Sequence, residues 1–270
     1  MGHLTVQKNK IIDLYQNNRL SIRAIAKVLD SSSSGIKRVL HKYNVPMRNK
    51  CESLNLCPEQ FTCEEFDIIL GSMLGDGAIT RHKSSNSECC FYEGHSTKQG
   101  KYAEYKYNKL RRWIGCQIYP LHHNLNGTYH TTLNFLTRRN KKFTILRNLF
   151  YVNNKKNSSK KLPYDLMSDK LNSLSLAIWA MDDGYNRHDR GFEFCSENFS
   201  KPDQNVLVNI LREKFNIVSH LGRIRKSEYR IKINKGDKNT LFNIVRPHII
   251  PSMEYKLESS EAIRQTLDTV

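Results

Sequence analysis

The 270-residue chain lacks any apolar run long enough to cross a bilayer, which takes about 20 residues in a helix. Its longest candidate, residues 68–74, is far shorter and is soon followed by Asp76. The first five residues carry no apolar core of the kind found in signal peptides. We therefore expect a protein without a membrane segment that stays inside the cell, in a bacterial or phage-infected cytoplasm or in an organelle.

Cysteine is sparse and unpatterned, with seven residues at irregular spacing. Cys51, Cys57 and Cys63 recur every six residues, whereas paired zinc ligands are usually two to four residues apart. The sequence therefore predicts neither a disulfide framework nor a zinc site, and it favours a reducing compartment.

Acidic residues are scarce as well. The chain has 26 Asp and Glu against 43 Lys and Arg, which gives a formal charge of +17. The hydrophobic share of 39% is enough for a folded core. Such a charge indicates a polyanionic partner, with nucleic acid in the first place and an anionic membrane surface as the alternative. Because the basic residues are spread along the whole chain, nucleic acid is favoured.

Residues 1–50 are predicted to form a separate all-α module. Apolar residues at helical spacing predict three helices, over 8–16, 22–29 and 36–43. Ser21 is placed to cap the second helix, and Asp30 can take the left-handed conformation that the next turn needs. This order is typical of a helix-turn-helix, with a plain three-helix bundle as the alternative.

The outer face of the third helix is basic, because Lys37 and Arg38 lie outside its apolar stripe. We expect these two residues to contact DNA, aided by Ser33 and Ser34. Residues 51–60 are predicted to form a polar linker.

From residue 61 onward the chain contains an internal repeat. Two apolar helical runs, 69–77 and 176–184, each end in Asp-Gly. Thr62 with Glu65 forms a capping-box pattern before the first run, and Ser173 or Ser175 is the expected cap of the second. Each run thus starts as a capped helix and ends in the same dipeptide.

Each of these runs is followed by the same succession of predicted elements: two strands, an amphipathic helix, a hairpin and a further helix. The predicted fold class is α+β, with two pseudo-symmetric αββαββα halves beside the N-terminal module. The halves are predicted at 61–155 and 173–270, joined by a linker at 156–172.

Asp76 and Asp183 are placed unfavourably for stability. Each stands at the C-terminal end of a helix, where a carboxylate meets the negative end of the helix dipole at a cost of about 0.3–1 kcal/mol. Each precedes a glycine suited to the left-handed position after a helix. A divalent cation such as Mg²⁺ would reverse that penalty. Gly71 and Gly75 share one helix face and would let the second helix approach closely, which would bring the two aspartates together.

The chain resembles the LAGLIDADG homing endonuclease family, in its single-chain form with two motifs. The resemblance covers about residues 61–258 and is carried by LSLAIWAMDDG at 174–184, by RPHIIPSMEYKL at 246–257 and by FYEGHSTKQ at 91–99. Trp179 and Met181 make the second helix bulkier than the family's motif.

The resemblance implies a saddle of two antiparallel sheets along double-stranded DNA, with the two motif helices on a pseudo-twofold axis. It implies a monomeric, site-specific endonuclease of the intron-homing type that cuts both strands with Mg²⁺, or with Mn²⁺ in its place. Asp76 and Asp183 would bind the metal, and each would serve one strand. This chemistry suits phosphodiester hydrolysis, which needs an activated water and neutralisation of charge on the phosphate.

The resemblance also implies one basic catalytic residue in each half. Lys256 matches one of them, and Lys160 is the expected second, with Lys161 as its alternative. A plain phosphate contact is the other interpretation of these lysines. Groove contacts are expected from strand residues and their neighbours, because alternate side chains share one face of a sheet. The expected residues are Lys98, Arg138, Arg187, Arg223, Arg225, Arg230 and Lys232.

Two other functions remain open on the same scaffold. An RNA-splicing maturase would need no cleavage carboxylates, and a DNA-binding regulator would be expected to have lost at least one of Asp76 and Asp183 and to have lost Lys256. All three are present, which favours the nuclease.

Overall fold

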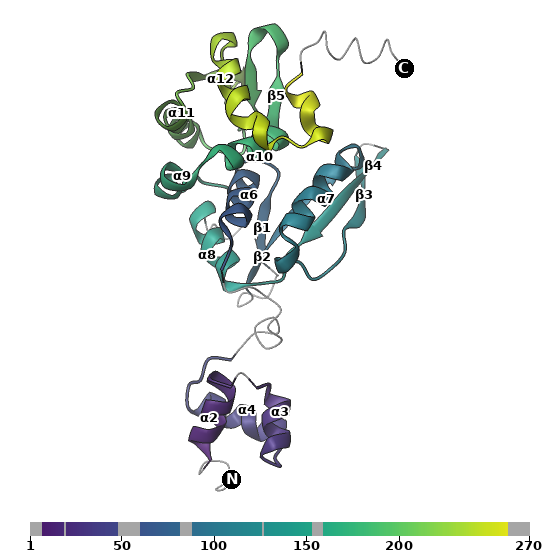
Figure 1. The fold of residues 1–270 in the computed structure, drawn as a ribbon, viewed down its shortest axis with the longest axis vertical. Helices are drawn as coiled ribbons and strands as arrows, with labels where there is room; N and C mark the ends of the chain where they lie inside the picture. Colours follow the sequence, from purple (N-terminus) through teal and green to yellow (C-terminus); the bar gives the residue numbers. More distant parts are fainter. Residues whose placement is uncertain are drawn as a thin grey trace. The chain divides into compact units, whose positions relative to one another are not determined.

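The backbone divides into two units, Met1–Pro58 and Glu59–Val270. The computed structural model describes residues 7–18, 20–47, 60–81, 88–125, 127–152 and 159–258 (Figure 1). The predicted linker at 51–60 lies outside these residues except for Gln60. Within the described residues no helix is both long and apolar enough to cross a membrane.

The N-terminal unit contains the three predicted helices, α2 (Lys8–Gln16), α3 (Ile22–Val28) and α4 (Ser33–Lys42). Ser21 accepts a hydrogen bond from the backbone of Ala24 and so caps α3, as predicted. Asp30 has φ of 45°, the left-handed conformation expected of the turn. The helices enclose their own apolar core around Ile11, Ile25 and Ile36, which indicates a unit that folds by itself.

The larger unit repeats one order of elements twice, and the predicted αββαββα halves are confirmed. The first half has α6 (Cys63–Leu74), β1 (Ala78–Arg81), β2 (Cys89–Ser96), α7 (Gly100–Lys109), β3 (Tyr119–Leu125), β4 (Thr128–Leu136) and α8 (Lys141–Phe150). The second half has α10 (Ser173–Asp183), β5 (Gly184–Asn186), β6 (Phe192–Phe194), α11 (Lys201–Phe215), β7 (Ser219–Arg225), β8 (Glu228–Ile233) and α12 (Lys235–Val245).

Shorter elements complete this unit. The predicted linker between the halves contains a helix that the sequence analysis missed, α9 (Tyr164–Lys170). Among the described residues of this unit, 3₁₀ turns lie at Thr97–Gln99, Arg111–Trp113, His188–Arg190, Arg246–His248 and Pro251–Lys256.

The two antiparallel sheets have the same topology, in the orders β1-β2-β4-β3 and β5-β6-β8-β7. In β2, side chains are alternately buried and half-buried from Cys89 to His95, because helices cover only one face of the sheet (Figure 1). The opposite face of each sheet is open. The pseudo-symmetry therefore gives the unit two equivalent open faces.

Helices α6 and α10 lie side by side at the centre of the larger unit (Figure 1). A Cβ on Gly71 would lie 2.5 Å from the Ser175 carbonyl oxygen and 2.6 Å from Ile178 Cβ. The backbones therefore approach too closely for any larger residue, as the glycine spacing predicts.

Two details of the motif helices differ from expectation. The capping box of Thr62 and Glu65 is present, but α10 is capped by Asn172, whose Oδ1 accepts from the Ser175 backbone, and not by Ser173 or Ser175. Gly184 has φ of −74°, so it does not take the left-handed conformation. It is needed instead for space, since a Cβ there would lie 2.2 Å from the Ala180 carbonyl oxygen.

Candidate active site and nucleic-acid interface

The repeated fold carries Asp76 and Asp183 to the matching ends of the two central helices. Asp183 is the last residue of α10, and Asp76 follows α6 by two residues. The Asp76 side chain is 41% exposed, whereas Oδ2 of Asp183 is buried without a hydrogen-bond partner in the described structure. One carboxylate is therefore open to solvent and the other is largely enclosed.

Asp183 is electrostatically strained. Its burial and the nearby carboxylates of Asp76 and Asp182 raise its pKa to about 8. An unpartnered, buried carboxylate oxygen beside a second carboxylate matches the oxygen ligands that Mg²⁺ and Mn²⁺ prefer. These carboxylates therefore fit a divalent cation, and ligand atoms of Asp76, His95 and Asp182 lie within 4.8 Å of one another in the described structure.

Lys160 and Lys256 occupy similar places at the two helix ends. Lys160 Nζ donates to the carbonyl oxygens of Met73 and Gly75, at 3.0 Å each. Lys256 Nζ donates to the carbonyl oxygen of Gly184 at 2.8 Å. Both lysines thus satisfy backbone acceptors next to a motif aspartate.

The surroundings of these lysines distinguish Lys160 from its alternative, Lys161. Burial lowers the pKa of Lys160 and Lys256, although nearby aspartates act in the opposite direction. Lys161 is exposed, and no contact of its ammonium group with the motif helices is seen in the described structure. The geometry therefore favours Lys160 as the counterpart of Lys256.

The sequence analysis missed His95 as a residue of the site that lies next to Asp76. His95 comes from β2 and is buried, with Nδ1 lying 3.4 Å from Asp76 Oδ2 and Nε2 lying 3.2 Å from Glu93 Oε1. Burial opposes its charge, but Asp76 and Glu93 outweigh that effect and raise the pKa of His95 to about 9. His95 therefore lies between two carboxylates that favour its charged form, although neither ring nitrogen makes a hydrogen bond of good geometry in the described structure.

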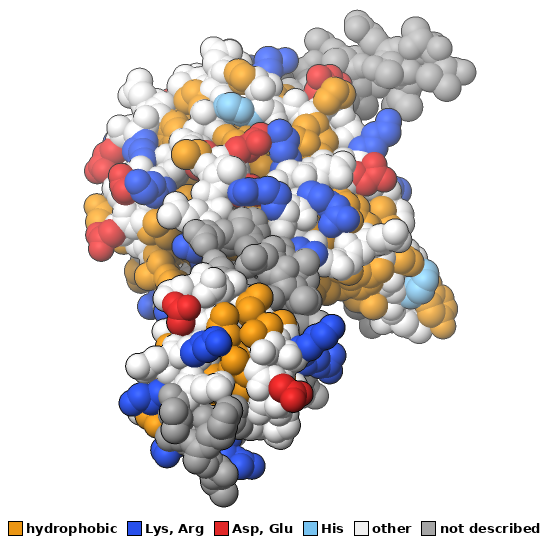
Figure 2. Space-filling view, turned by 60° about the horizontal axis from the view of Figure 1, so that its bottom comes forward, with side chains coloured by type: hydrophobic (Ala, Val, Ile, Leu, Met, Phe, Trp, Pro, Cys, Tyr) orange, Lys and Arg blue, Asp and Glu red, His pale blue; other side chains and the backbone are white. Residues whose placement is uncertain are grey.

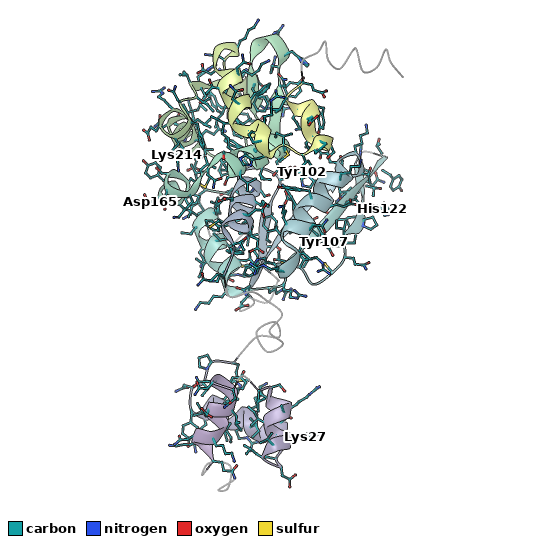
Figure 3. All side chains as sticks on the ribbon, in the orientation of Figure 1. Lys27, Tyr102, Tyr107, His122, Asp165 and Lys214 are labelled. Carbon is teal, nitrogen blue, oxygen red and sulfur yellow. The ribbon has the colours of Figure 1, made fainter. Side chains whose placement is uncertain are left out.

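Behind His95 lies a buried charged cluster that was also missed. Lys106 of α7 donates to Glu93 and, at 2.7 Å, to Oδ1 of Asp182. Tyr102, which is labelled in Figure 3, donates to the same Asp182 oxygen at 2.8 Å. Burial opposes the charge on Lys106, yet these carboxylates raise its pKa. The alternation of Phe91, Glu93 and His95 on one strand face was the available signal.

The open face of the second sheet carries basic side chains that are held by acidic ones. Arg230 Nε lies 2.6 Å from Glu197, and Lys232 Nζ lies 3.3 Å from Glu193. Arg225 pairs with Glu228 and forms an ion pair with it. Both side chains lie on the same open face, beyond a register shift in β7. These contacts orient three of the four predicted basic residues of the hairpin toward the open face.

Arg223 does not share that face, contrary to expectation. It pairs with Tyr229, and Tyr229 alternates with Arg230 along β8, so the two basic residues point to opposite sides. The Arg223 guanidinium donates to the carbonyl oxygens of Arg225 and Lys226 in the turn. The register shift that follows Arg223 breaks the alternation on which the prediction relied.

The remaining predicted contacts lie in varied places. Arg187 Nη1 lies 3.2 Å from Glu193, and Arg138 Nη1 donates to the Arg112 carbonyl oxygen. Lys98 is exposed in a 3₁₀ turn after β2. In the N-terminal unit Lys37 and Arg38 are exposed on α4, as predicted. Figure 2 shows Lys and Arg side chains scattered over the visible surface of the larger unit rather than gathered in one patch.

The open face of the first sheet has a different chemistry. In the strands β1 to β4 as described, the register places no Lys or Arg on this face. Neutral polar and aromatic groups take their place, and Tyr92 donates to Asn134 at 2.6 Å. The side chains there include Tyr92, Tyr119, His123, His130, Thr132 and Asn134. The two open faces therefore differ in charge.

Comparison with known proteins identifies the family. The sequence model described as the LAGLIDADG DNA endonuclease family matches residues 66–241. The chain belongs to this family. The resemblance seen in the Asp-Gly helix ends is thereby confirmed.

Proteins similar to this LAGLIDADG protein include ones named as maturases, as intron-encoded endonucleases and as "Protein RecA". It is 29% identical over 238 residues to "Cytochrome b mRNA maturase bI2" of Saccharomyces cerevisiae, covering 85% of this chain and 55% of that protein. It is 28% identical over 199 residues to "Probable intron-encoded endonuclease 1" of Wickerhamomyces canadensis, covering 71% and 82% of the two chains.

A solved structure supports the LAGLIDADG fold. The homing endonuclease I-WcaI bound to its DNA recognition sequence superimposes with a TM-score of 0.69 at 22% identity, covering 81% of this chain and 97% of that one. The α+β class with two pseudo-symmetric halves is therefore confirmed.

Proposed function

We propose that this LAGLIDADG protein is a site-specific endonuclease of the homing type that cuts both strands of double-stranded DNA. The observation that carries the proposal is the placement of Asp76 and Asp183 at matching ends of paired helices, each beside a half-buried lysine. Two equivalent carboxylate centres suit a duplex, which has two scissile phosphates.

Within this proposal Asp76 and Asp183 hold the divalent cation. Mg²⁺ or Mn²⁺, when bound, supplies positive charge that neutralises the phosphate and favours ionisation of the attacking water. The chain's own residues do the rest. Lys160 and Lys256 keep a half-buried positive charge beside each carboxylate, where it can stabilise the negative charge that develops on the phosphate.

The two open sheet faces are proposed to bind the major groove of DNA. Arg230 and Lys232 on the second sheet suit guanine edges and phosphates, whereas Asn134 and Tyr92 on the first sheet offer neutral hydrogen bonds. The difference between the faces predicts an asymmetric site rather than a palindrome. The protein would act as a monomer, because it contains both halves.

The proposal is tested by incubating the purified protein with a randomised duplex library, with Mg²⁺ or with EDTA, and sequencing the cut ends. We expect one family of asymmetric sites, cut on both strands only when Mg²⁺ is present. Stable binding without any cut would refute the endonuclease.

Lys256→Ala and Lys160→Ala are expected to slow single-turnover cleavage by about 10²-fold, as the loss of a proton-transfer or charge-stabilising group does. Lys161→Ala is the matched control and should leave the rate unchanged, because that side chain is exposed. Salt titrations of affinity provide the second measurement. A Lys256→Ala protein with a near-normal rate and a log–log salt slope smaller by about one unit would mean that Lys256 only contacts phosphate.

Removal of residues 1–50 is expected to leave a folded nuclease with a shorter footprint. The larger unit has its own core, and linked binding modules typically raise avidity by about 10²-fold or more. Affinity and footprint are measured by gel shift and nuclease protection. An unchanged footprint would contradict a DNA-binding role for Lys37 and Arg38.

An RNA-splicing role is the second candidate, favoured by the similarity to a protein named as a maturase. Splicing of a candidate host intron in vitro, with and without the protein, tests it separately from cleavage. Asp76→Asn should retain any such activity, because splicing assistance needs no cleavage carboxylate.

A further inference from the structure

The two halves differ at the positions that surround their motif helices. Ser72 of α6 corresponds to Trp179 of α10, 107 residues later, as Asp76 corresponds to Asp183. Both side chains are fully buried, but one is polar and the other is the largest apolar side chain available. The repeat therefore has different interiors in its two halves.

The strands extend this difference. Ala78, two residues after Asp76, pairs with Tyr92, and Tyr185, two residues after Asp183, pairs with Glu193. The next residues along the second strands, Glu93 and Phe194, are therefore equivalent.

The helices that follow these strands differ in the same way. Thirteen residues beyond Glu93 and Phe194 come Lys106 and Leu207, both fully buried. In the second half Trp179 stacks on Phe194 with centroids 3.8 Å apart, so this space is apolar. The first half fills it with charges.

The charged cluster receives its second carboxylate from the other half. Asp182 enters from α10 over Gly75, where a Cβ would lie 2.4 Å from Asp182 Cβ. Its Oδ2 accepts from the Asp76 backbone at 3.3 Å, and its Oδ1 accepts from Lys106. Gly75 thus leaves room for an acid of the second half beside the aspartate of the first.

A continuous line of contacts results. Asp182 binds Lys106, Lys106 binds Glu93, Glu93 contacts His95, and His95 contacts the carboxylate of Asp76. All residues of this line except Asp76 are buried. In the described part of the chain no such buried line reaches Asp183, because its half has Phe194 and Leu207 at the matching places.

We propose that Glu93, Lys106 and Asp182 are positioning residues that hold Asp76 through His95, and that they control cleavage of one DNA strand only. The inference rests on the proposed endonuclease function and makes its two centres chemically unequal. Each buried charge has a partner, so the line fixes the Asp76 side chain at a site where it is otherwise exposed to solvent.

The test uses a full-length variant in which the three charges are removed together, Glu93→Gln, Lys106→Met and Asp182→Asn. Joint removal avoids an uncompensated buried charge, which is the main cause of unfolding when one partner is lost. The duplex selected from the library carries a different fluorophore on each strand. The strand that depends on Asp76 is the one whose cutting is slowed more by Asp76→Asn. We expect the triple variant to cut this strand about 10- to 100-fold more slowly than the wild-type protein does, which is the loss caused by a misplacement near 1 Å. The other strand should be slowed clearly less, because Asp182 affects Asp183 only through its nearby charge, so nicked duplex accumulates.

The matched control is Glu64→Gln with Lys109→Met, which removes an exposed ion pair between the same two helices, α6 and α7. It should leave both rates within about twofold of wild type, because exposed pairs contribute little. Equal slowing of both strands in the triple variant, or no slowing of either, would overturn this inference but leave the proposed endonuclease function intact. Wild-type protein that cuts neither strand would overturn the proposed function and the inference with it.

Discussion

Asp76→Asn and Asp183→Asn are each expected to abolish double-strand cleavage while DNA binding persists. The substitution keeps the size of the side chain but removes the charge that the metal needs. A single group that stabilises charge at a reacting centre is typically worth about 10²–10³-fold in rate, and the loss of a metal ligand should reach at least that. Affinity should be kept, since each change removes a negative charge near the DNA phosphates.

Single-turnover cleavage and gel-shift affinity, measured with Mg²⁺ on the same labelled duplex, provide the check. Asp165→Asn serves as the control, because Asp165 is exposed on α9. Full double-strand cleavage by either motif variant would refute the assignment of the site. A variant that nicks one strand at a normal rate would show which aspartate serves which strand.

DNA affinity is expected to fall steeply with salt. The formal charge of +17 is spread over both halves and the N-terminal unit, so binding should involve many phosphates. Each neutralised phosphate releases condensed counterions, with a log–log slope of about −0.9 per contact on duplex DNA. A footprint with about ten contacts would lose roughly 10³–10⁵-fold in affinity between 50 and 200 mM salt.

The measurement is the dissociation constant at several salt concentrations for wild type and for Arg230→Gln with Lys232→Gln. The slope of the variant should be smaller by about two units if both side chains contact phosphate, and nearly unchanged if they bind only base edges. A shallow slope for the wild-type protein would contradict broad contact with the DNA backbone, whatever the cleavage assays show.

Most of the fold was predictable because it depends on local patterns. Apolar spacing predicted the motif helices, and the two Asp-Gly ends predicted the repeat. The helix α9 was missed because its seven residues carry a weak apolar pattern and directly follow Pro163. The cap of α10 was assigned to Ser173 or Ser175, one or three residues too late, since Asn172 and the serines that follow it are all good caps.

The aspartates and lysines of the site were predictable, whereas the cluster behind Asp76 was not. Lys106 and Asp182 are 76 residues apart, so no local pattern relates them. Lys106 lies in a helix rich in polar residues, so the sequence alone suggests that its side chain is exposed. Asp182 directly precedes Asp183 and therefore looks like part of the motif. Only the packing of α10 beside α6 and α7 brings the two side chains together as one buried ion pair.

The insertion of Asp182 into the first half has a consequence for synthesis of the chain. Translation completes α6, β2 and α7 well before α10 is made, so the nascent first half has Lys106 and Glu93 in place without the second carboxylate. The apolar side of α6 around Gly71 also has no partner at that stage. A ribosome that stops between the two motifs would therefore release a product with an uncovered helix surface and an incomplete charge cluster, which chaperones and proteases recognise. Folding of the first half is finished only by residues that are translated after it.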